Sequence, residues 1–204
     1  MAIAVRTERD PRAVALQIVQ LDVFGRGQHN YAYRSLSTMA SFEQVRHRPR
    51  TELSYPRELV VACVPMRSNV NISTIARTAS ASGVQKLVLC GNNKLISKIA
   101  RDGADELEIV VRRTLLPALK QFKDDGYRLV GVEQATNSQN IHDYSFEERT
   151  LLVVGNERLG IADDVLAALD DIIEIPVFGL PHSFNAATAT SMAIYEYCRQ
   201  YSSY

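Results

Sequence analysis

The chain has 204 residues, of which 46% are apolar and 23% charged, and its formal net charge is zero. This composition is ordinary for a globular protein, and the length suits one domain with a full core and a short extension. The longest apolar run, residues 59–64, is strand-sized, which excludes a membrane span, and the N-terminus lacks a secretory signal pattern. Three scattered cysteines exclude a disulfide framework or a zinc site, so we expect a reducing, cytoplasmic compartment.

The first 56 residues form a basic N-terminal extension. Residues 11–24 predict an amphipathic helix, whereas residues 25–56 have poor periodicity. Residues 1–57 contain nine arginines against five acidic residues, and Arg46, Arg48 and Arg50 lie close together. Two interpretations stay open, a solvated linker or an arm that contacts phosphates.

A second domain, residues 57–204, alternates strand-like and helix-like runs. Strands are expected at residues 58–64, 86–90, 108–111, 127–132, 151–154 and 172–177. Helices are expected at residues 72–82, 94–101, 115–124, 162–169 and 186–201. Strands separated by helices predict parallel pairing and a doubly wound α/β sheet, in which ligands bind at the carboxyl ends of the strands.

The first motif with chemical potential spans residues 65–83 and leads from a buried strand through a polar turn into a helix. Asn71 and Arg77 are expected to project toward the strand ends. A purely structural interpretation is also open, with Asn71 as a helix cap and Arg77 in a surface ion pair.

The second motif, residues 153–161, follows a buried strand. Gly155 would let a ligand approach the backbone, because no Cβ intervenes. Glu157 could serve a site or could simply favour the start of a helix through the helix dipole.

The third motif, residues 175–191, is a turn-rich loop that leads into the last helix. Ser183 or Asn185 is a natural N-cap for this helix. The small residues 186–193 suit tight helix packing or a close contact between subunits.

Together, in this order and spacing, the three motifs closely resemble those of the SpoU/TrmH family of RNA ribose 2′-O-methyltransferases in the SPOUT superfamily. The resemblance covers about residues 57–201. Phe184 departs mildly from the leucine or methionine usual at the centre of the third motif. The matching positions are Asn71 and Arg77 in the first motif, Gly155, Glu157 and Gly160 in the second, and Ile175, Pro176, Ser183 and Asn185 in the third.

The resemblance implies a parallel-sheet α/β domain with a deep trefoil knot at its carboxyl end, an exception to the general absence of knots. It also implies a homodimer whose site lies near the subunit interface, with S-adenosyl-L-methionine as cofactor and no metal. Carried over residue by residue, the cofactor would contact Val132, Gly155, Ile175, Ser183 and Phe184.

The implied reaction is attack of a ribose 2′-hydroxyl on the cofactor's methyl group. Asn71, Glu157, Ser183 and Asn185 would form a supporting hydrogen-bond shell, in which Glu157 would orient Arg77 or Asn71. The family proposes Arg77 as general base. Because a guanidinium is effectively always protonated, orientation of a phosphate and stabilisation of charge are equally open roles for Arg77. The short N-terminal extension and the run at residues 126–161 resemble enzymes that act on tRNA, and rRNA stays open as substrate.

Three rival functions make different demands on the sequence. A nicotinamide-dependent oxidoreductase would need a glycine-rich turn after the first strand, but residues 65–69 contain no glycine. A non-catalytic RNA-binding relative and a purely structural interaction protein stay open; cofactor binding and turnover would discriminate them.

Overall fold

The computed structural model describes residues 42–45, 49–101 and 106–202. The chain divides after Arg48, and the fold described below is that of residues 49–204. The helix predicted at residues 11–24, and most of the extension predicted to reach residue 56, lie outside the described residues. The domain boundary at residue 57 therefore stays a prediction.

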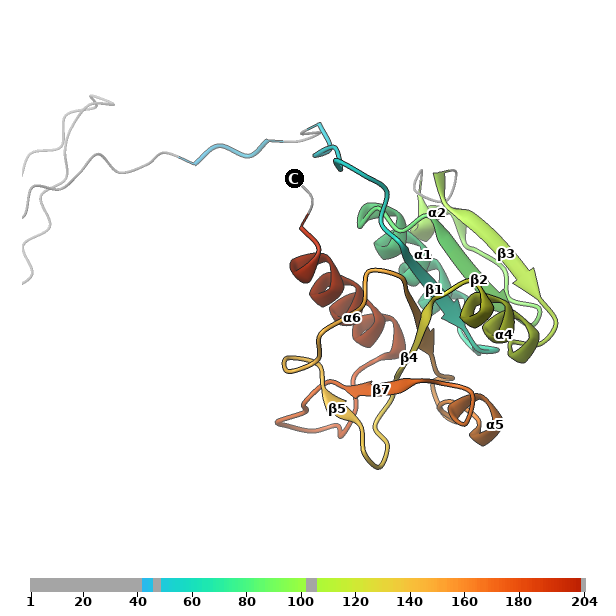
Figure 1. The fold of residues 1–204 in the computed structure, drawn as a ribbon. Coiled ribbons are helices and arrows are strands. Elements are labelled where there is room, and N and C mark those ends of the chain that lie inside the picture. The colour runs from blue at the N-terminus through green and yellow to red at the C-terminus, as the bar shows by residue number, and fades with distance from the viewer. Residues whose placement is uncertain (1–41, 46–48, 102–105, 203–204) are drawn as a thin grey trace, which may run out of the picture. The chain divides into compact units, whose positions relative to one another are not determined.

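A parallel β-sheet forms the centre of the described domain (Figure 1). Its strand order is β3-β2-β1-β6-β4-β7-β5, and each neighbouring pair is parallel. The predicted parallel α/β fold is thus confirmed. The strands are β1 (Leu59–Cys63), β2 (Lys86–Cys90), β3 (Glu108–Arg112), β4 (Arg128–Val132), β5 (Gln139–Asn140), β6 (Thr150–Val154) and β7 (Asp171–Glu174).

Helices cover both faces of this sheet, as the continuous burial of the central strands requires. All five residues of β1 and of β6 are buried. One face packs against α1 (Asn69–Ala81) and α6 (Ala186–Gln200), and the other packs against α4 (Leu116–Asp124) and α5 (Asp163–Leu166). Successive β1 residues alternate between these two cores, since side chains along a strand point to opposite faces. The short helix α2 (Ser97–Ala100) lies between β2 and β3 in the chain.

Several element ends differ from the sequence-based expectation. The strand expected at residues 172–177 ends at Glu174, where Pro176 follows closely and cannot donate a ladder hydrogen bond. The helix expected at residues 162–169 keeps only Asp163–Leu166, and the one expected at residues 94–101 keeps only Ser97–Ala100. Strand β5 was not predicted, because two polar residues carry no periodic signal.

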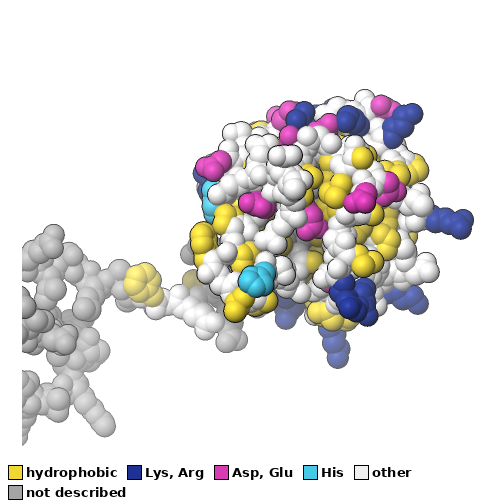
Figure 2. Space-filling view, turned by 90° about the horizontal axis from the view of Figure 1, so that it is seen from below, with side chains coloured by type: hydrophobic (Ala, Val, Ile, Leu, Met, Phe, Trp, Pro, Cys, Tyr) yellow, Lys and Arg dark blue, Asp and Glu magenta, His cyan; other side chains and the backbone are white. Residues whose placement is uncertain are grey.

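Charged side chains are distributed unevenly over the domain. Figure 2 shows Lys and Arg side chains along the lower rim of one face, with no Asp or Glu side chain among them, and acidic side chains elsewhere on that face. No helix in the described ranges is both long and apolar enough to cross a membrane.

Candidate active site

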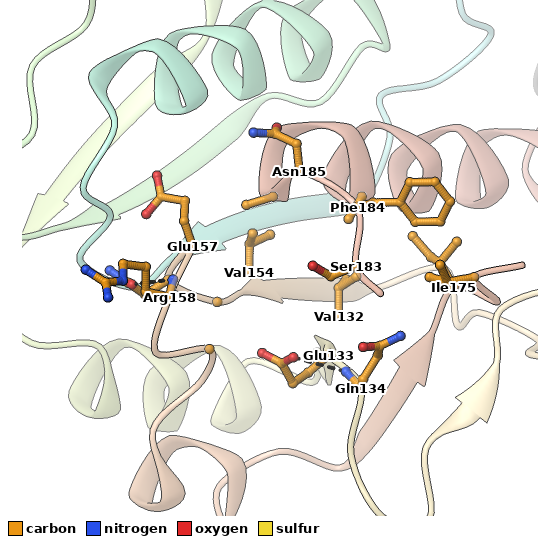
Figure 3. Close-up of a pocket in the computed structure, with 16 residues that line it drawn as sticks. Val132, Glu133, Gln134, Val154, Glu157, Arg158, Ile175, Ser183, Phe184 and Asn185 are labelled. Carbon is orange, nitrogen blue, oxygen red and sulfur yellow. Dashed lines mark hydrogen bonds between the residues drawn. The ribbon is translucent and has the colours of Figure 1, made fainter. Parts of the chain in front are cut away.

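Three loops meet at the carboxyl ends of β4, β6 and β7 and enclose a cavity of about 400 Å³. Figure 3 shows Glu157 and Asn185 along one side of this pocket, Glu133 and Gln134 along the opposite side, and Ser183 between them. Every residue expected to contact a cofactor lines the pocket. The lining residues are Val132, Glu133, Gln134, Val154, Gly155, Asn156, Glu157, Arg158, Gly160, Ile175, Val177, Ser183, Phe184, Asn185, Ala186 and Ala189.

The floor of the pocket depends on two glycines. A Cβ at Gly155 would lie 2.9 Å from Oε2 of Glu133 and 2.9 Å from the carbonyl carbon of Gly160. Gly160 has a φ of +66°, and a Cβ there would lie 2.7 Å from the same carboxylate oxygen. Both positions therefore require glycine, but at Gly155 the groups that approach closely are Glu133 and Gly160 of the protein itself, and the predicted approach of a ligand stays a prediction.

Asn156 shapes the turn between these glycines. Its side-chain oxygen accepts hydrogen bonds from the backbone N–H groups of Arg158 (2.9 Å) and Leu159 (3.1 Å). Its amide nitrogen donates to the carbonyl of Pro65 at 2.7 Å, which ties the loop after β6 to the loop after β1. The second motif is thus held rigidly against the first.

Glu157 connects the second motif to the first. Its Oε1 accepts hydrogen bonds from the side chain of Asn71 and from the backbone N–H of Ser68, both at 3.0 Å. Its Oε2 accepts from the backbone N–H of Arg67 at 2.9 Å. Glu157 therefore binds the turn that starts α1, rather than solvating the start of a helix of its own.

These hydrogen bonds keep Glu157 ionised. Burial by itself raises the pKa of its carboxyl group, but the hydrogen bonds from Arg67, Asn71 and Ser68 outweigh burial and hold the pKa below its ordinary value. The site consequently contains a fixed carboxylate at neutral pH, and this carboxylate acts only as a hydrogen-bond acceptor.

Asn185 brings the third motif into the same network. Its Nδ2 donates to Oδ1 of Asn71 at 3.1 Å. Its Oδ1 caps α6 by accepting from the N–H groups of Ala187 (2.9 Å) and Thr188 (3.3 Å). The prediction of Ser183 or Asn185 as N-cap is therefore resolved in favour of Asn185.

The interpretation of Asn71 as a helix cap is wrong. The N-cap of α1 is Ser68, whose hydroxyl accepts a hydrogen bond from the N–H of Asn71 at 3.2 Å. Asn71 lies inside the first turn, three residues after the cap, and its side chain is free to join Glu157 and Asn185. The expected helix start at residue 72 was late because Ser68, Asn69 and Asn71 resemble a polar turn, whereas the helix begins at Asn69.

Arg77 lies apart from this network. It is exposed on α1, does not line the pocket, and forms no ion pair with any residue in the described ranges. Arg77 therefore has no acidic ion-pair partner within those ranges, and the structure does not support its interpretation as part of a surface ion pair. Within one chain, the structure brings Asn71, Glu157, Ser183 and Asn185 to the strand ends but leaves Arg77 on the helix surface.

Glu133 is a pocket residue that the sequence analysis missed. It directly follows β4, and its carboxylate accepts hydrogen bonds from the N–H groups of Gln134 (3.0 Å) and Ile161 (3.2 Å). Its place immediately after a buried strand is the signal that could have found it, as it did for Gly155 after β6. No cluster of three or more potential metal ligands occurs among the described residues.

Comparison with known proteins agrees with this architecture. The sequence pattern described as the SpoU rRNA Methylase family matches residues 58–195. The chain belongs to this family. The tRNA (guanosine(18)-2′-O)-methyltransferase of Mus musculus is 33% identical over 153 residues, which are 72% of this chain but only 10% of the mouse protein.

Two solved structures extend the similarity to the fold. The Aquifex aeolicus TrmH/SpoU tRNA modifying enzyme has a TM-score of 0.69 at 27% identity, covering 74% of this chain and 78% of that one. The SpoU methyltransferase AviRb of Streptomyces viridochromogenes, in complex with AdoMet, has a TM-score of 0.60 at 25% identity, with 73% and 60% coverage. The parallel α/β sheet is therefore the sheet of this family.

Proposed function

We propose that the protein transfers a methyl group from S-adenosylmethionine to a ribose 2′-hydroxyl of RNA, with tRNA as the favoured substrate. The observation that carries this proposal is the hydrogen-bonded series Glu157–Asn71–Asn185, which joins all three motifs beside one pocket. The names of the mouse and Aquifex relatives support tRNA, whereas the family description keeps rRNA as the alternative.

The pocket suits the proposed cofactor. Its volume of about 400 Å³ falls within the range of small-molecule sites. Val132, Ile175 and Phe184 offer apolar walls, and the backbone at Gly155 forms part of the lining. S-adenosylmethionine supplies a methyl group that its positive sulfur already activates, and the Glu133 carboxylate suits a ligand with that charge. Ser183 adds a hydroxyl that can bind the ligand or the ribose.

The remaining task of the protein is to position the ribose and to help remove the hydroxyl proton. We assign the fixed array of Glu157, Asn71 and Asn185 to positioning, because each of these side chains already has its orientation set by its partners. Two roles stay open for Arg77, which are to accept the hydroxyl proton or to bind and orient a phosphate. Arg77 has no ion pair in the described part of the chain, so its guanidinium is available for either role.

A homodimer would bring Arg77 to a site. The exposed stripe of α1 contains Val70 and Arg77, which are seven residues apart and so share one helix face. The neighbouring α6 exposes Met192 and Tyr195, and the two helices are joined by a hydrogen bond between Thr78 and Ser191. Exposed apolar side chains on the same two helices as an arginine that has no ion pair among the described residues suit contact with a second copy of this chain.

Two further features belong to the same proposal. We infer that the segment after β7 threads the trefoil knot, since residues 175–185 leave the sheet and line the pocket before α6 begins. We infer a reducing, cytoplasmic compartment, which is supported by the three free thiols of Cys63, Cys90 and Cys198.

The decisive experiment measures transfer of labelled methyl from S-adenosylmethionine to unmodified bulk tRNA and, separately, to rRNA, with mapping of the modified nucleotide. Arg77→Ala should abolish transfer while keeping the native circular dichroism spectrum. Lys120→Ala, at another exposed helical cation, should leave transfer unchanged. Cofactor binding without transfer to either RNA would contradict the proposed activity, and transfer to rRNA alone would contradict the favoured substrate.

A further inference from the structure

Cations at the two ends of the sheet differ in their partners. At the amino ends of the strands, four cations lie in ion pairs with acidic residues of a neighbouring segment. The pairs are Lys86–Glu108 (3.3 Å), Lys123–Asp170 (2.6 Å), Arg128–Asp171 (2.7 Å) and Arg149–Glu58 (2.8 Å). These charges are neutralised within the domain.

At the carboxyl ends, five cations remain exposed and have no ion pair with any described residue. They follow β3, β2, β1 and β6, which are consecutive neighbours in the sheet. We call these residues the basic edge: Arg112 and Arg113, Lys94, Arg67, and Arg158.

Hydrogen bonds between the loops make the basic edge one continuous surface. The N–H of Gly91 donates to the carbonyl of Arg112 at 3.2 Å, which joins the ends of β2 and β3. Asn93 donates to the carbonyl of Met66 at 2.7 Å, which joins the loops after β2 and β1. Asn156 then joins the loops after β1 and β6 through Pro65. The row is therefore held in place by the folded domain.

The basic edge runs along the sheet from the end of β3 to the pocket. It extends across three strand spacings, roughly 15 Å, which is enough to contact several phosphates of one nucleic-acid strand. It ends at Arg158, which lines the pocket beside Glu157. On the far side of the pocket, Glu133 lines the wall and Glu174 ends β7, and their negative charges would repel a phosphate backbone.

We propose that the basic edge binds the phosphate backbone of the RNA strand that contains the target ribose, and that the strand approaches the pocket from the β3 side. This inference rests on the proposed function, because it takes RNA as the substrate. It assigns the two halves of the carboxyl edge to different ligands: the β3–β1 half to RNA, and the β4–β7 half to the cofactor. Arg67 and Arg158 lie inside the first and second motifs, but the sequence alone assigned a role to none of the five cations.

The test compares two triple variants of the full chain with equal changes in net charge. Lys94→Gln, Arg112→Gln and Arg113→Gln remove cations of the basic edge that do not line the pocket. Lys86→Gln, Lys120→Gln and Arg199→Gln form the matched control, since these cations lie on or toward the opposite end of the domain. Affinity for an unmodified tRNA transcript is measured between about 50 and 200 mM salt, the range over which counterion release changes affinity strongly.

The basic-edge variant should bind the transcript more weakly than the wild type and with a flatter salt dependence. Three lost contacts to a single strand change the slope of log affinity against log salt concentration by about 2. The ratio of wild-type affinity to variant affinity should therefore fall about 20-fold over this salt range. The control variant should keep the wild-type slope, and both variants should bind S-adenosylmethionine as the wild type does in calorimetry. Equal slopes for the basic-edge variant and the wild type would overturn the proposal.

This design separates the basic edge from the proposed function. A wild type that methylates RNA, with a basic-edge variant of unchanged slope, would refute the basic edge and keep the activity. A wild type with a steep slope that the variant flattens, but with no methyl transfer, would refute the activity and keep the binding surface.

Discussion

The side chain of Asn71 donates a 3.0 Å hydrogen bond to Glu157 and accepts a 3.1 Å hydrogen bond from Asn185. Because an ionised carboxylate can only accept, the nitrogen of Asn71 must face Glu157 and its oxygen must face Asn185. Asn185 must then donate from its own side-chain nitrogen to the oxygen of Asn71, which leaves the oxygen of Asn185 to cap α6. The charge on one glutamate thus sets the orientation of two amides that come from different ends of the domain.

The first prediction concerns Glu157→Gln. The substituted amide cannot accept from Arg67, Ser68 and Asn71 at once without turning a donor toward one of them. We expect the free energy of unfolding to fall by about 1–3 kcal/mol, the usual effect of losing hydrogen bonds to a charged group. Urea denaturation with an intrinsic fluorescence or circular dichroism readout measures this change.

Glu58→Gln is the matched control for this variant. Glu58 accepts from Arg149 at 2.8 Å in an ion pair whose side chains are 49% and 45% exposed. Exposed pairs contribute at most about 1 kcal/mol, so this variant should unfold close to the wild type. Equal losses in the two variants would mean that Glu157 is an ordinary surface carboxylate.

The second prediction uses the glycine after β6. Gly155→Ala would place a methyl group 2.9 Å from Glu133 and 2.9 Å from backbone of Gly160, and the backbone cannot yield as a flexible side chain can. We expect weaker binding of S-adenosylmethionine by calorimetry, because Glu133 and the turn at Gly160 both line the pocket. Gly179→Ala is the control, since no atom lies within 4 Å of a Cβ there. Unchanged binding by the Gly155 variant would show that the floor of the pocket is not a ligand contact.

Much of the fold was predictable because its signals are local. Buried runs such as residues 86–90 are continuous and bounded by polar turns, so β2 was predicted with the bounds that the structure has. Gly155 was singled out for its place at a strand end. The short strand β5 was missed because it depends on pairing at the edge of the sheet rather than on periodicity. The early end of β7 was missed although Pro176, which limits the strand, is visible in the sequence.

Most contacts within the site were beyond the reach of the sequence, and the pairing of Glu157 with Asn71 was expected only from the family resemblance. Asn71 and Glu157 lie 86 residues apart, and Asn71 and Asn185 lie 114 apart. Periodicity places each residue on an element, but only the strand order brings the three loops together. The sequence also could not show that Arg77 stays outside the pocket of its own chain, since the orientation of α1 depends on how it packs against α6.

The third prediction concerns acid stability and involves Asp171 at the start of β7. The hydrogen bonds from Arg128 lower the pKa of its carboxyl group, burial opposes them, and the Tyr144 hydroxyl at 2.8 Å adds to the lowering. A carboxyl whose folded-state pKa lies below its unfolded value stabilises the fold above that unfolded value, near 3.8. This stability is lost as the pH falls through the folded-state pKa.

Asp171→Asn should therefore reduce the loss in the free energy of unfolding as the pH falls into the acid range. Urea unfolding, repeated at intervals from about pH 6 down to about pH 3, should show a smaller pH-dependent loss for the variant than for the wild type. Glu106→Gln, at an exposed ion pair with Arg50, should retain the wild-type curve. An acid limb as steep in the Asp171 variant as in the wild type would refute the assignment.

The fourth prediction separates the two roles of Asn185. Asn185→Ala removes the cap of α6 and should cost about 1 kcal/mol of stability, as losses of N-caps usually do. Asn185→Asp retains an oxygen for the N–H groups of Ala187 and Thr188, and its charge favours the positive end of the helix dipole. The aspartate variant should therefore be more stable than the alanine variant.

The aspartate variant should nevertheless lose methyl transfer to RNA. Its second carboxylate oxygen cannot donate to Oδ1 of Asn71, and Asn71 cannot turn around because its nitrogen is held by Glu157. Two acceptors would then face each other, and the array that positions the ribose would open. Rates of labelled methyl incorporation into tRNA, measured beside urea unfolding for both variants, test this directly. An aspartate variant with wild-type stability and wild-type transfer would show that Asn185 acts only as a helix cap.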